Sequence, residues 1–298
     1  MEILKIDHLV KRFGDKTVLK GIDLSVKAGG IYGFIGQNGA GKTTTMKAIL
    51  GLLKPDEGEI TVCGEKVVFG ETKTNRYIGY LPDVPEFYSF MTAREYLQLC
   101  GESLGMNRQD IKRRSNELLE LVGLSGERHR IKGYSRGMKQ RLGIAQALLC
   151  SPKLLICDEP TSALDPIGRK EILDILLSVK EQTTVLFSTH ILSDVERICT
   201  NVAFLHNGQI AMQDSVTELK KMHPSQEFSV TPADKHIIPT ILQDFPDGKN
   251  ASEDRIVFSG DDQKMFAVLG YLAKRQIPIT EIQRIEPTLE SLFMEVVG

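Results

Sequence analysis

The residues from Gly36 to Thr43 have the types and spacing that suit a nucleotide phosphate chain. They read Gly-Gln-Asn-Gly-Ala-Gly-Lys-Thr, which fits the P-loop pattern Gly-x-x-x-x-Gly-Lys-[Ser/Thr]. Glycine leaves backbone N–H groups free to turn inward around phosphate oxygens, because no Cβ stands in the way. Lys42 supplies positive charge for the terminal phosphates, and the Thr43 hydroxyl can ligate Mg²⁺. The predicted nucleotide-binding residues of this loop are Gly36, Gln37, Asn38, Gly39, Ala40, Gly41, Lys42, Thr43 and Thr44.

Two acidic residues, Asp158 and Glu159, follow the continuous apolar run 154–157. A carboxylate at the carboxyl end of a strand lies at the ligand-binding edge of an open α/β sheet, so Asp158 is placed to hold Mg²⁺ directly or through water. Glu159 is placed to polarise the attacking water as a general base. The alternative is that Asp158 only caps the turn at Pro160, and the P-loop upstream favours the metal role.

The segments around these residues predict an α/β core. Residues 31–35 read as a buried strand running into the P-loop, and apolar residues recur at helical spacing after it. Residues 154–157 and 184–187 are continuous apolar strands, typical of a parallel sheet covered on both sides. Residues 2–30 alternate like a half-exposed antiparallel sheet. The apolar helix stripe after the loop consists of Met46, Ile49, Leu50 and Leu53.

A second domain is expected from about residue 223, where short strands alternate with helices. The boundaries are therefore 1–222 for the nucleotide-binding domain and 223–298 for a small C-terminal α+β domain. Its predicted strands are 227–230, 255–259 and 279–284, and its predicted helices are 234–243, 262–275 and 288–297.

The bulk composition argues against two classes of protein, those that bind nucleic acid through a basic surface and those that span a membrane. The net charge is −2 and the isoelectric point is about 6.3, so no basic field attracts nucleic acid, and we expect no nucleic-acid partner. No run approaches the ~20 apolar residues of a membrane span, and residues 1–5 lack a signal-peptide pattern. We expect a cytosolic chain, or one held at a membrane by something else.

Further motifs, in order along residues 2 to about 220, resemble those of the ATP-binding subunit of an ABC transporter. Residues 134–141, Tyr-Ser-Arg-Gly-Met-Lys-Gln-Arg, stand where that family has its Leu-Ser-Gly-Gly-Gln signature. Residues 162–165, Ser-Ala-Leu-Asp, match its D-loop, and His190 ends a strand as its switch histidine does. Phe13 matches the aromatic residue that stacks on adenine.

The resemblance implies a fold, a reaction and a set of site residues. The fold is an ABC-type P-loop ATPase, with a mixed β core, an antiparallel β lobe and a helical subdomain at about 87–150. The cofactors are ATP and Mg²⁺. The implied catalytic residues are Lys42, Glu159 and His190, and the implied metal-site residues are Thr43, Asp158 and Asp83. The residues implied to contact ATP outside the phosphate loop are Phe13, Ser135, Gly137 and Asp165. In the family two subunits pair head to tail, and the signature of one subunit contacts the ATP bound by the other. The signature here lies at the N-terminus of a helix expected at 138–150, which favours an anion.

The chain departs from the family pattern at three positions. Asp83 stands where the family has glutamine after the strand 77–81, and a carboxylate acts on Mg²⁺ through water but donates no amide hydrogen bond. Arg136 replaces the first signature glycine and Met138 replaces the signature glutamine. Arg136 either adds positive charge beside the phosphate or points to solvent.

These departures, with the closing segment 286–293, resemble exporter ATPases of the bacitracin-resistance and lantibiotic-immunity type, whose permease is a separate polypeptide. The expected function is to power export, of drugs or antimicrobial peptides, through ATP-driven dimerisation. The expected partners are an integral-membrane permease and a second ATP-binding subunit in a homodimer, and the expected location is peripheral, at the cytoplasmic face of the cell membrane. The competing class is a soluble ABC ATPase of DNA repair, chromosome structure or translation, but zinc modules, coiled-coil insertions and a second cassette are missing.

An aromatic cluster marks the place where a permease would dock in that family. Its members either form the groove for a coupling helix of the permease or belong to the core of the helical subdomain, and both uses are expected. They are Phe87, Tyr88, Phe90, Met91 and Tyr96.

Overall fold

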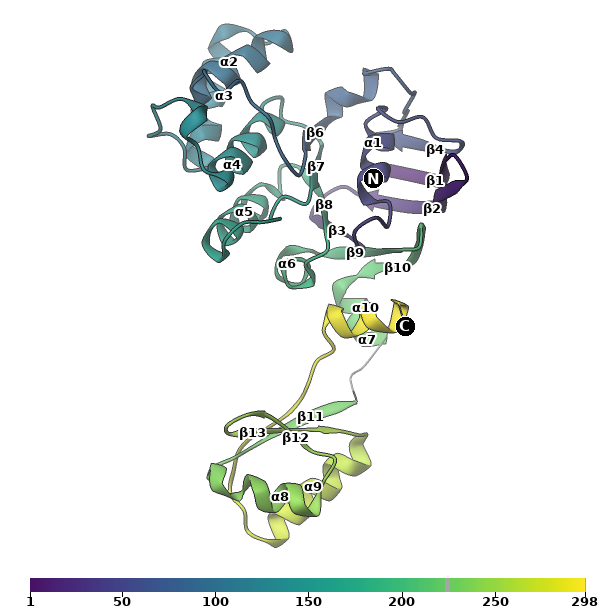
Figure 1. Cartoon of the computed structure of the whole chain (residues 1–298), viewed down its shortest axis with the longest axis vertical. Helices are drawn as coiled ribbons and strands as arrows, with labels where there is room; N and C mark the ends of the chain where they lie inside the picture. The colour runs from purple at the N-terminus through teal and green to yellow at the C-terminus, as the bar shows by residue number, and fades with distance from the viewer. Residues whose placement is uncertain (223–225, 298) are drawn as a thin grey trace. The chain divides into compact units, whose positions relative to one another are not determined.

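The computed structural model describes residues 1–222 and 226–297. It divides into two compact units (Figure 1): Met1–Val216 together with the chain from Phe293 onward, and Thr217–Leu292. The boundary expected after residue 222 lies at the end of α7 (Val216–Met222), one helix beyond this division.

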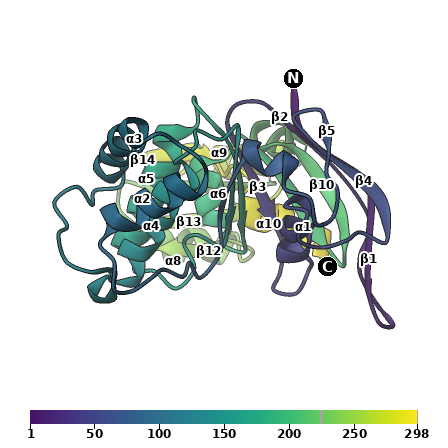
Figure 2. The same ribbon diagram turned by 90° about the horizontal axis from the view of Figure 1, so that it is seen from above.

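The first unit is built on a six-stranded sheet. Its strands lie in the order β10 (Gln209–Ser215), β9 (Asn201–His206), β3 (Ile31–Ile35), β8 (Thr184–Thr189), β7 (Leu154–Asp158) and β6 (Ile78–Leu81). All neighbours are parallel except β10, which pairs antiparallel with β9. Every residue of β7 and β8 is buried, as their continuous apolar runs predict for strands covered on both faces. Helices α5 (Pro166–Val179) and α6 (Leu192–Ile198) cover one face, and α1 (Lys42–Ile49) covers the other (Figures 1 and 2).

A second, antiparallel sheet lies on the far side of α1. It has the order β2 (Lys16–Lys27), β1 (Glu2–Phe13), β4 (Glu57–Val62) and β5 (Glu65–Lys66). Met46 and Ile49 of α1 share one core with Phe34 of β3 and with Leu4 of β1, so this helix joins the two sheets. The predicted apolar stripe is too long, because α1 ends at Ile49 and leaves Leu53 beyond the helix.

Three helices form the helical subdomain: α2 (Ala93–Ser103), α3 (Arg108–Leu121) and α4 (Arg136–Ala147). They lie together in both views (Figure 2). Each begins at a capping side chain, which satisfies a backbone N–H that the helix leaves free. Ser135 accepts from the Met138 amide and starts α4 at Arg136, two positions before the expected Met138.

The second unit has the order β11 (Glu227–Pro232), α8 (Ile238–Asp244), β12 (Lys249–Ser252), β13 (Arg255–Ser259), α9 (Asp262–Lys274) and β14 (Ile279–Arg284). Its antiparallel sheet runs β12, β13, β11, β14, which is the split βαβ arrangement of a ferredoxin-like domain. Phe228 and Phe258 stack at 5.3 Å in a core that includes Ile241 of α8 and Val268 of α9. The sequence did not predict β12, since all four of its residues are exposed and polar or small.

The last helix, α10 (Leu289–Val297), returns the chain to the first unit. Phe293 stacks on Phe204 of β9, with ring centroids 5.7 Å apart. Within residues 1–222 and 226–297, α10 included, no helix combines the length and the apolar character needed to cross a bilayer.

Candidate functional site

The P-loop connects the end of β3 to the start of α1, at the carboxyl edge of the parallel strands. Gly36 must be glycine because a Cβ there would lie 2.6 Å from the backbone oxygen of Leu205 on β9. Gly41 must be glycine because its φ of 114° is disfavoured for side-chain-bearing residues. It forms the N-cap of α1, so the free N–H groups of that helix point into the loop, where they favour an anion.

Lys42, Glu159 and His190 form one chain of contacts across this edge. Lys42 Nζ donates to the Gly36 carbonyl at 2.6 Å and lies 3.1 Å from Glu159 Oε1. His190 Nδ1 lies 2.8 Å from Glu159 Oε2. The side chains of Lys42 and Glu159 are 6% and 13% exposed, whereas that of His190 is 44% exposed. Glu159 Oε1 is buried with Lys42 as its ion-pair partner, and Oε2 contacts His190, so both carboxylate oxygens have a partner.

The Asp158 carboxylate is held between two hydroxyl groups. Thr43 Oγ1 donates to one oxygen at 2.8 Å, and Ser188 Oγ of β8 donates to the other at 2.6 Å. The Thr43 hydroxyl and a carboxylate oxygen therefore converge where a Mg²⁺ ion would need two oxygen ligands, and the donor set fits that ion. No cluster of three or more His, Cys, Asp or Glu side chains that could hold a metal ion occurs in the described part of the chain.

A hollow of about 210 Å³ adjoins the P-loop. It is lined by Lys16, Thr17, Val18, Lys20, Gln37, Asn38, Gly39, Ala40, His206, Asn207 and Gly208. Phe13 pairs with Lys16 across the β1–β2 turn and is 51% exposed, with Lys11 Nζ 5.4 Å from its ring centroid. Phe13 does not line the hollow itself, although its pairing partner Lys16 does, and the stacking of Phe13 on adenine stays a prediction.

The signature residues lie apart from the P-loop, in the helical subdomain. Ser135 caps α4, and Gly137 is in its first turn, where a Cβ would meet nothing nearer than 4.0 Å. Asp165 caps α5 by accepting from the Gly168 amide at 3.2 Å. Ser135 and Gly137 lie at the start of α4, whereas Lys42 begins α1 and Asp158 ends β7.

Two of the three departures from the family pattern meet in space. Arg136 lies 3.4 Å from Asp83 Oδ1, and Gln140 Nε2 donates to the Asp83 carbonyl at 2.6 Å. Arg136 therefore keeps a partner although it is partly exposed. Burial raises the pKa of the Asp83 carboxyl, Arg136 opposes that rise, and the charges of Glu159 and Asp158 reinforce it. The role of Asp83 at the metal stays a prediction.

Replacing Arg136 with glycine is expected to leave ATP turnover within about three-fold, because an ion pair with both side chains nearly half exposed contributes only about 0–1 kcal/mol. The measurement is the steady-state ATPase rate at saturating ATP. A loss of more than about ten-fold, which corresponds to ~1.4 kcal/mol, would show that Arg136 contacts the reacting phosphate.

The aromatic cluster splits between core and surface. Tyr96 is buried, packs edge-on against Phe87 at 5.0 Å and donates to Gln146. Tyr88 and Phe90 are 55% and 62% exposed. Beside them a hollow of about 400 Å³ is lined by Asp83, Val84, Pro85, Glu86, Phe87, Ser89, Ile131, Arg136 and Lys139. This hollow, called the Phe87 groove below, is bounded by the Asp83–Arg136 pair.

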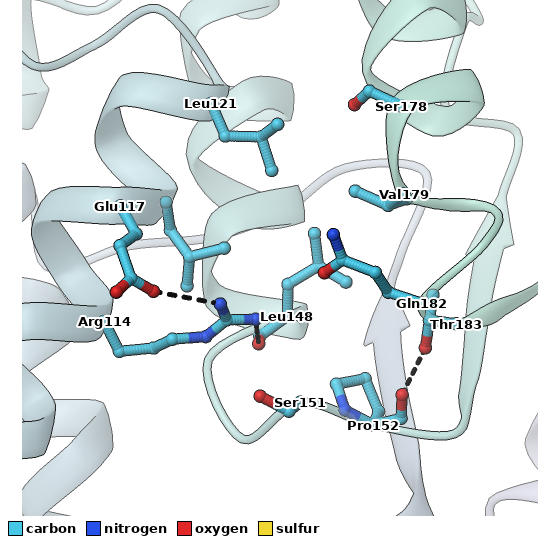
Figure 3. Close-up of a pocket in the computed structure, with 11 residues that line it drawn as sticks. Arg114, Glu117, Leu121, Leu148, Ser151, Pro152, Ser178, Val179, Gln182 and Thr183 are labelled. Atoms are coloured by element: carbon cyan, nitrogen blue, oxygen red, sulfur yellow. Dashed lines mark hydrogen bonds and ion pairs between the residues drawn. The ribbon is translucent and has the colours of Figure 1, made fainter.

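Another hollow, of about 340 Å³, lies between α3, the end of α4 and the end of α5 (Figure 3). Its polar groups largely satisfy one another: Arg114 donates to the Leu148 carbonyl and to Glu117, and Thr183 donates to the Pro152 carbonyl. None of the predicted nucleotide residues line it, so it lies outside the candidate site.

The sequence interpretation missed Ser188, Gln140 and a buried pair, Thr161 and Asp194. A usable signal existed for Ser188, because a hydroxyl inside a fully buried strand must find a partner. Gln140, Thr161 and Asp194 are also buried, but no local pattern marks them, since each depends on a residue at least 33 positions away.

Comparison with known proteins shows which family this chain resembles. The family model described as ABC transporter matches residues 19–162. YxlF, an uncharacterized ABC transporter ATP-binding protein of Bacillus subtilis, is 37% identical over 99% of this chain and 99% of its own length. The bacitracin transport ATP-binding protein BcrA of Bacillus licheniformis is 36% identical over 99% of this chain and 97% of its own length.

A solved structure agrees in fold. The ATP-binding cassette MJ0796, in a dimeric post-hydrolysis state bound to ADP and Pi, superposes with a TM-score of 0.64 at 27% identity, over 72% of this chain and 98% of that one. The predicted fold class is confirmed. With the P-loop, the Asp158–Glu159 pair and the signature helix in place, the chain belongs to the family of ABC transporter ATP-binding proteins.

Proposed function

We propose that this chain is the ATP-binding and hydrolysing subunit of an ABC exporter and powers the efflux of a drug or antimicrobial peptide through a separate permease. The observation that supports export most directly is the 36% identity to BcrA, named for bacitracin transport, along nearly the full chain. The proposed location is peripheral, at the cytoplasmic face of the cell membrane.

The proposed reaction is attack of water on the γ-phosphate of ATP, which breaks the bond between the γ-phosphorus and the oxygen that bridges to the β-phosphate and releases ADP and inorganic phosphate. Glu159 takes the proton of that water as general base, and His190, 2.8 Å from it, orients the carboxylate. Lys42 is held at the phosphate loop by the Gly36 carbonyl, and its charge would stabilise the β- and γ-phosphates there. Thr43 and Asp158, with Asp83 acting through water, would hold a Mg²⁺ ion, which when bound would supply positive charge for the phosphates.

The proposed active form is a homodimer. Ser135 and Gly137 lie on α4 and Lys42 lies on α1, and in this proposal a second subunit supplies the signature residues that complete each site. The dimeric state in which MJ0796 was solved supports this assembly for a similar cassette. Since one chain holds both halves of the site, two copies would form two competent sites. ATP would then favour the closed pair through contacts absent from the open one.

The proposed permease contact is the Phe87 groove with its exposed rim. Changing Tyr88, which is 55% exposed, to glutamate should abolish permease capture, because it places a charge where an apolar helix would dock. The matched control is Phe69→Glu, which changes an aromatic residue that is 53% exposed and lies outside this groove. Equal capture by Tyr88→Glu and by the unaltered chain would place the docking surface elsewhere.

The test of the whole proposal is a pull-down of a trapped state. Glu159→Gln is tagged in its native host, membranes are solubilised gently with ATP present, and the co-purifying proteins are identified. Capture of a multi-span membrane protein is the expected result. A catch restricted to ribosomes or nucleic acid, or no catch at all, would overturn the exporter proposal in favour of a soluble ABC ATPase.

A further inference from the structure

A buried carboxylate outside the nucleotide residues connects the two segments that hold the proposed catalytic pair. Asp194 lies on α6, four residues after His190, and its side chain is 4% exposed. It accepts from Thr161 Oγ1 at 2.8 Å and from Arg169 Nε at 2.6 Å. Arg169 also donates to Ser193 Oγ at 2.9 Å. The cluster Thr161, Arg169 and Asp194, called the Asp194 network below, therefore joins α6 to the loop after β7 and to α5.

The loop that this network holds is strained. Glu159 and Ala163 have φ values of 49° and 52°, in the left-handed region that side-chain-bearing residues rarely adopt. Such conformations persist only where the surroundings hold them in place. Thr161 is midway between these two residues and is 1% exposed, and its hydroxyl has Asp194 as partner. The Thr161–Asp194 bond is thus the side-chain contact at the centre of the strained segment.

We propose that the Asp194 network sets the position of Glu159 and of the Asp165 loop relative to His190, and that Thr161 and Asp194 are positioning residues for hydrolysis. The inference rests on the proposed ATP hydrolysis, since it concerns the placement of its base. Neither residue is within the phosphate loop, so their loss acts on chemistry more than on ATP binding. A catalytic group displaced by about 1 Å can lose up to 10²-fold in rate.

The same two helices offer a matched control. Arg197 of α6 and Asp174 of α5 form an ion pair at 2.8 Å, but their side chains are 41% and 49% exposed. Water and salt screen such a pair, so breaking it changes little. If a weaker surface contact between α5 and α6 is enough to lower turnover, the Arg197→Ala variant will show that loss. If turnover depends on the position of Glu159, the Arg197→Ala variant will not show it.

The test measures kcat, KM and ATP affinity for five variants of the full chain. Thr161→Val, nearly the same size as threonine, should lower kcat by about 10–100-fold with KM within about two-fold. Thr161→Ser keeps the hydroxyl and should retain kcat within about three-fold, as should Arg197→Ala. The kcat of Asp194→Asn, and that of the double variant Thr161→Val, Asp194→Asn, should lie no more than about ten-fold below the kcat of Thr161→Val. The reason is that the effects of residues that act as one unit do not add.

The outcomes separate this inference from the proposed function. If the unaltered chain hydrolyses ATP and Thr161→Val keeps kcat within two-fold, the positioning role is wrong and the ATPase assignment stands. An equal loss in Thr161→Val and Arg197→Ala, or a fully additive double variant, also overturns it. No hydrolysis by the unaltered chain, with ATP bound, would overturn the proposed reaction and the inference with it. Should Thr161→Val not fold, Thr161→Ser against Thr161→Ala provides the same comparison.

Discussion

Glu159→Gln is expected to lower ATP turnover by about 10²–10⁴-fold while ATP still binds, because an amide is too weak a base to take the proton of the attacking water. The structure gives the reason for the selectivity. Glutamine keeps the shape and the oxygen that faces Lys42, so the Lys42–Gly36 contact that aims the cation is retained. ATP bound without hydrolysis should then hold the dimer closed.

Steady-state phosphate release measures turnover, equilibrium binding of ATP measures affinity, and gel filtration with and without ATP reports the dimer. Glu171→Gln is the control, because it makes the same change in an acid on α5. The Glu171 side chain is 46% exposed, and its ion pair with Arg141 is longer, at 3.7 Å, than the pair of Glu159 with Lys42. Turnover of Glu159→Gln within ten-fold of the unaltered chain would remove Glu159 as the base and leave water activation to another group.

Lys42→Ala is expected to weaken ATP binding by about 10–100-fold, because a hydrogen bond to a charged group contributes about 1.5–3 kcal/mol. The lysine is 6% exposed and its amino group is held by the Gly36 carbonyl. The side chain is therefore already ordered before ATP binds, and binding costs little further conformational entropy. Turnover should fall with affinity, since the same charge stabilises the phosphates during transfer.

The matched control for this prediction is Lys47→Ala. Lys47 lies on the same helix, one turn later, and is exposed, so its loss removes one positive charge from α1 without touching the loop. Isothermal titration with ATP compares the two variants. Affinity of Lys42→Ala within about three-fold of the unaltered chain would show that the backbone N–H groups of the loop hold the phosphates alone.

The sequence predicted those helices and strands whose formation depends on local signals such as alternation of apolar residues and flanking turn residues. The strands at Arg255–Ser259 and Ile279–Arg284 occur at the expected residues, because alternation and flanking turn residues are local signals. Strand β12 has no such signal, since Lys249–Ser252 is exposed throughout and is a strand only through its pairing with β13. Helix α4 begins at Arg136, two residues before the expected Met138, because the Ser135 side chain caps the helix there.

The sequence by itself determined the reaction class, because the phosphate loop from Gly36 to Thr43 and the acids at the end of β7 each lie within a few consecutive residues, so their chemistry is visible as spacing. Tertiary structure alone decided which of these groups touch. Ser188 meets Asp158 because β7 and β8 are neighbours, Arg136 meets Asp83 across 53 residues, and Asp194 meets Thr161 across 33. The physical reason is that the order of strands in the sheet and the packing of helices bring these partners together. Both depend on contacts between residues far apart in the sequence, so no short segment of the chain predicts them.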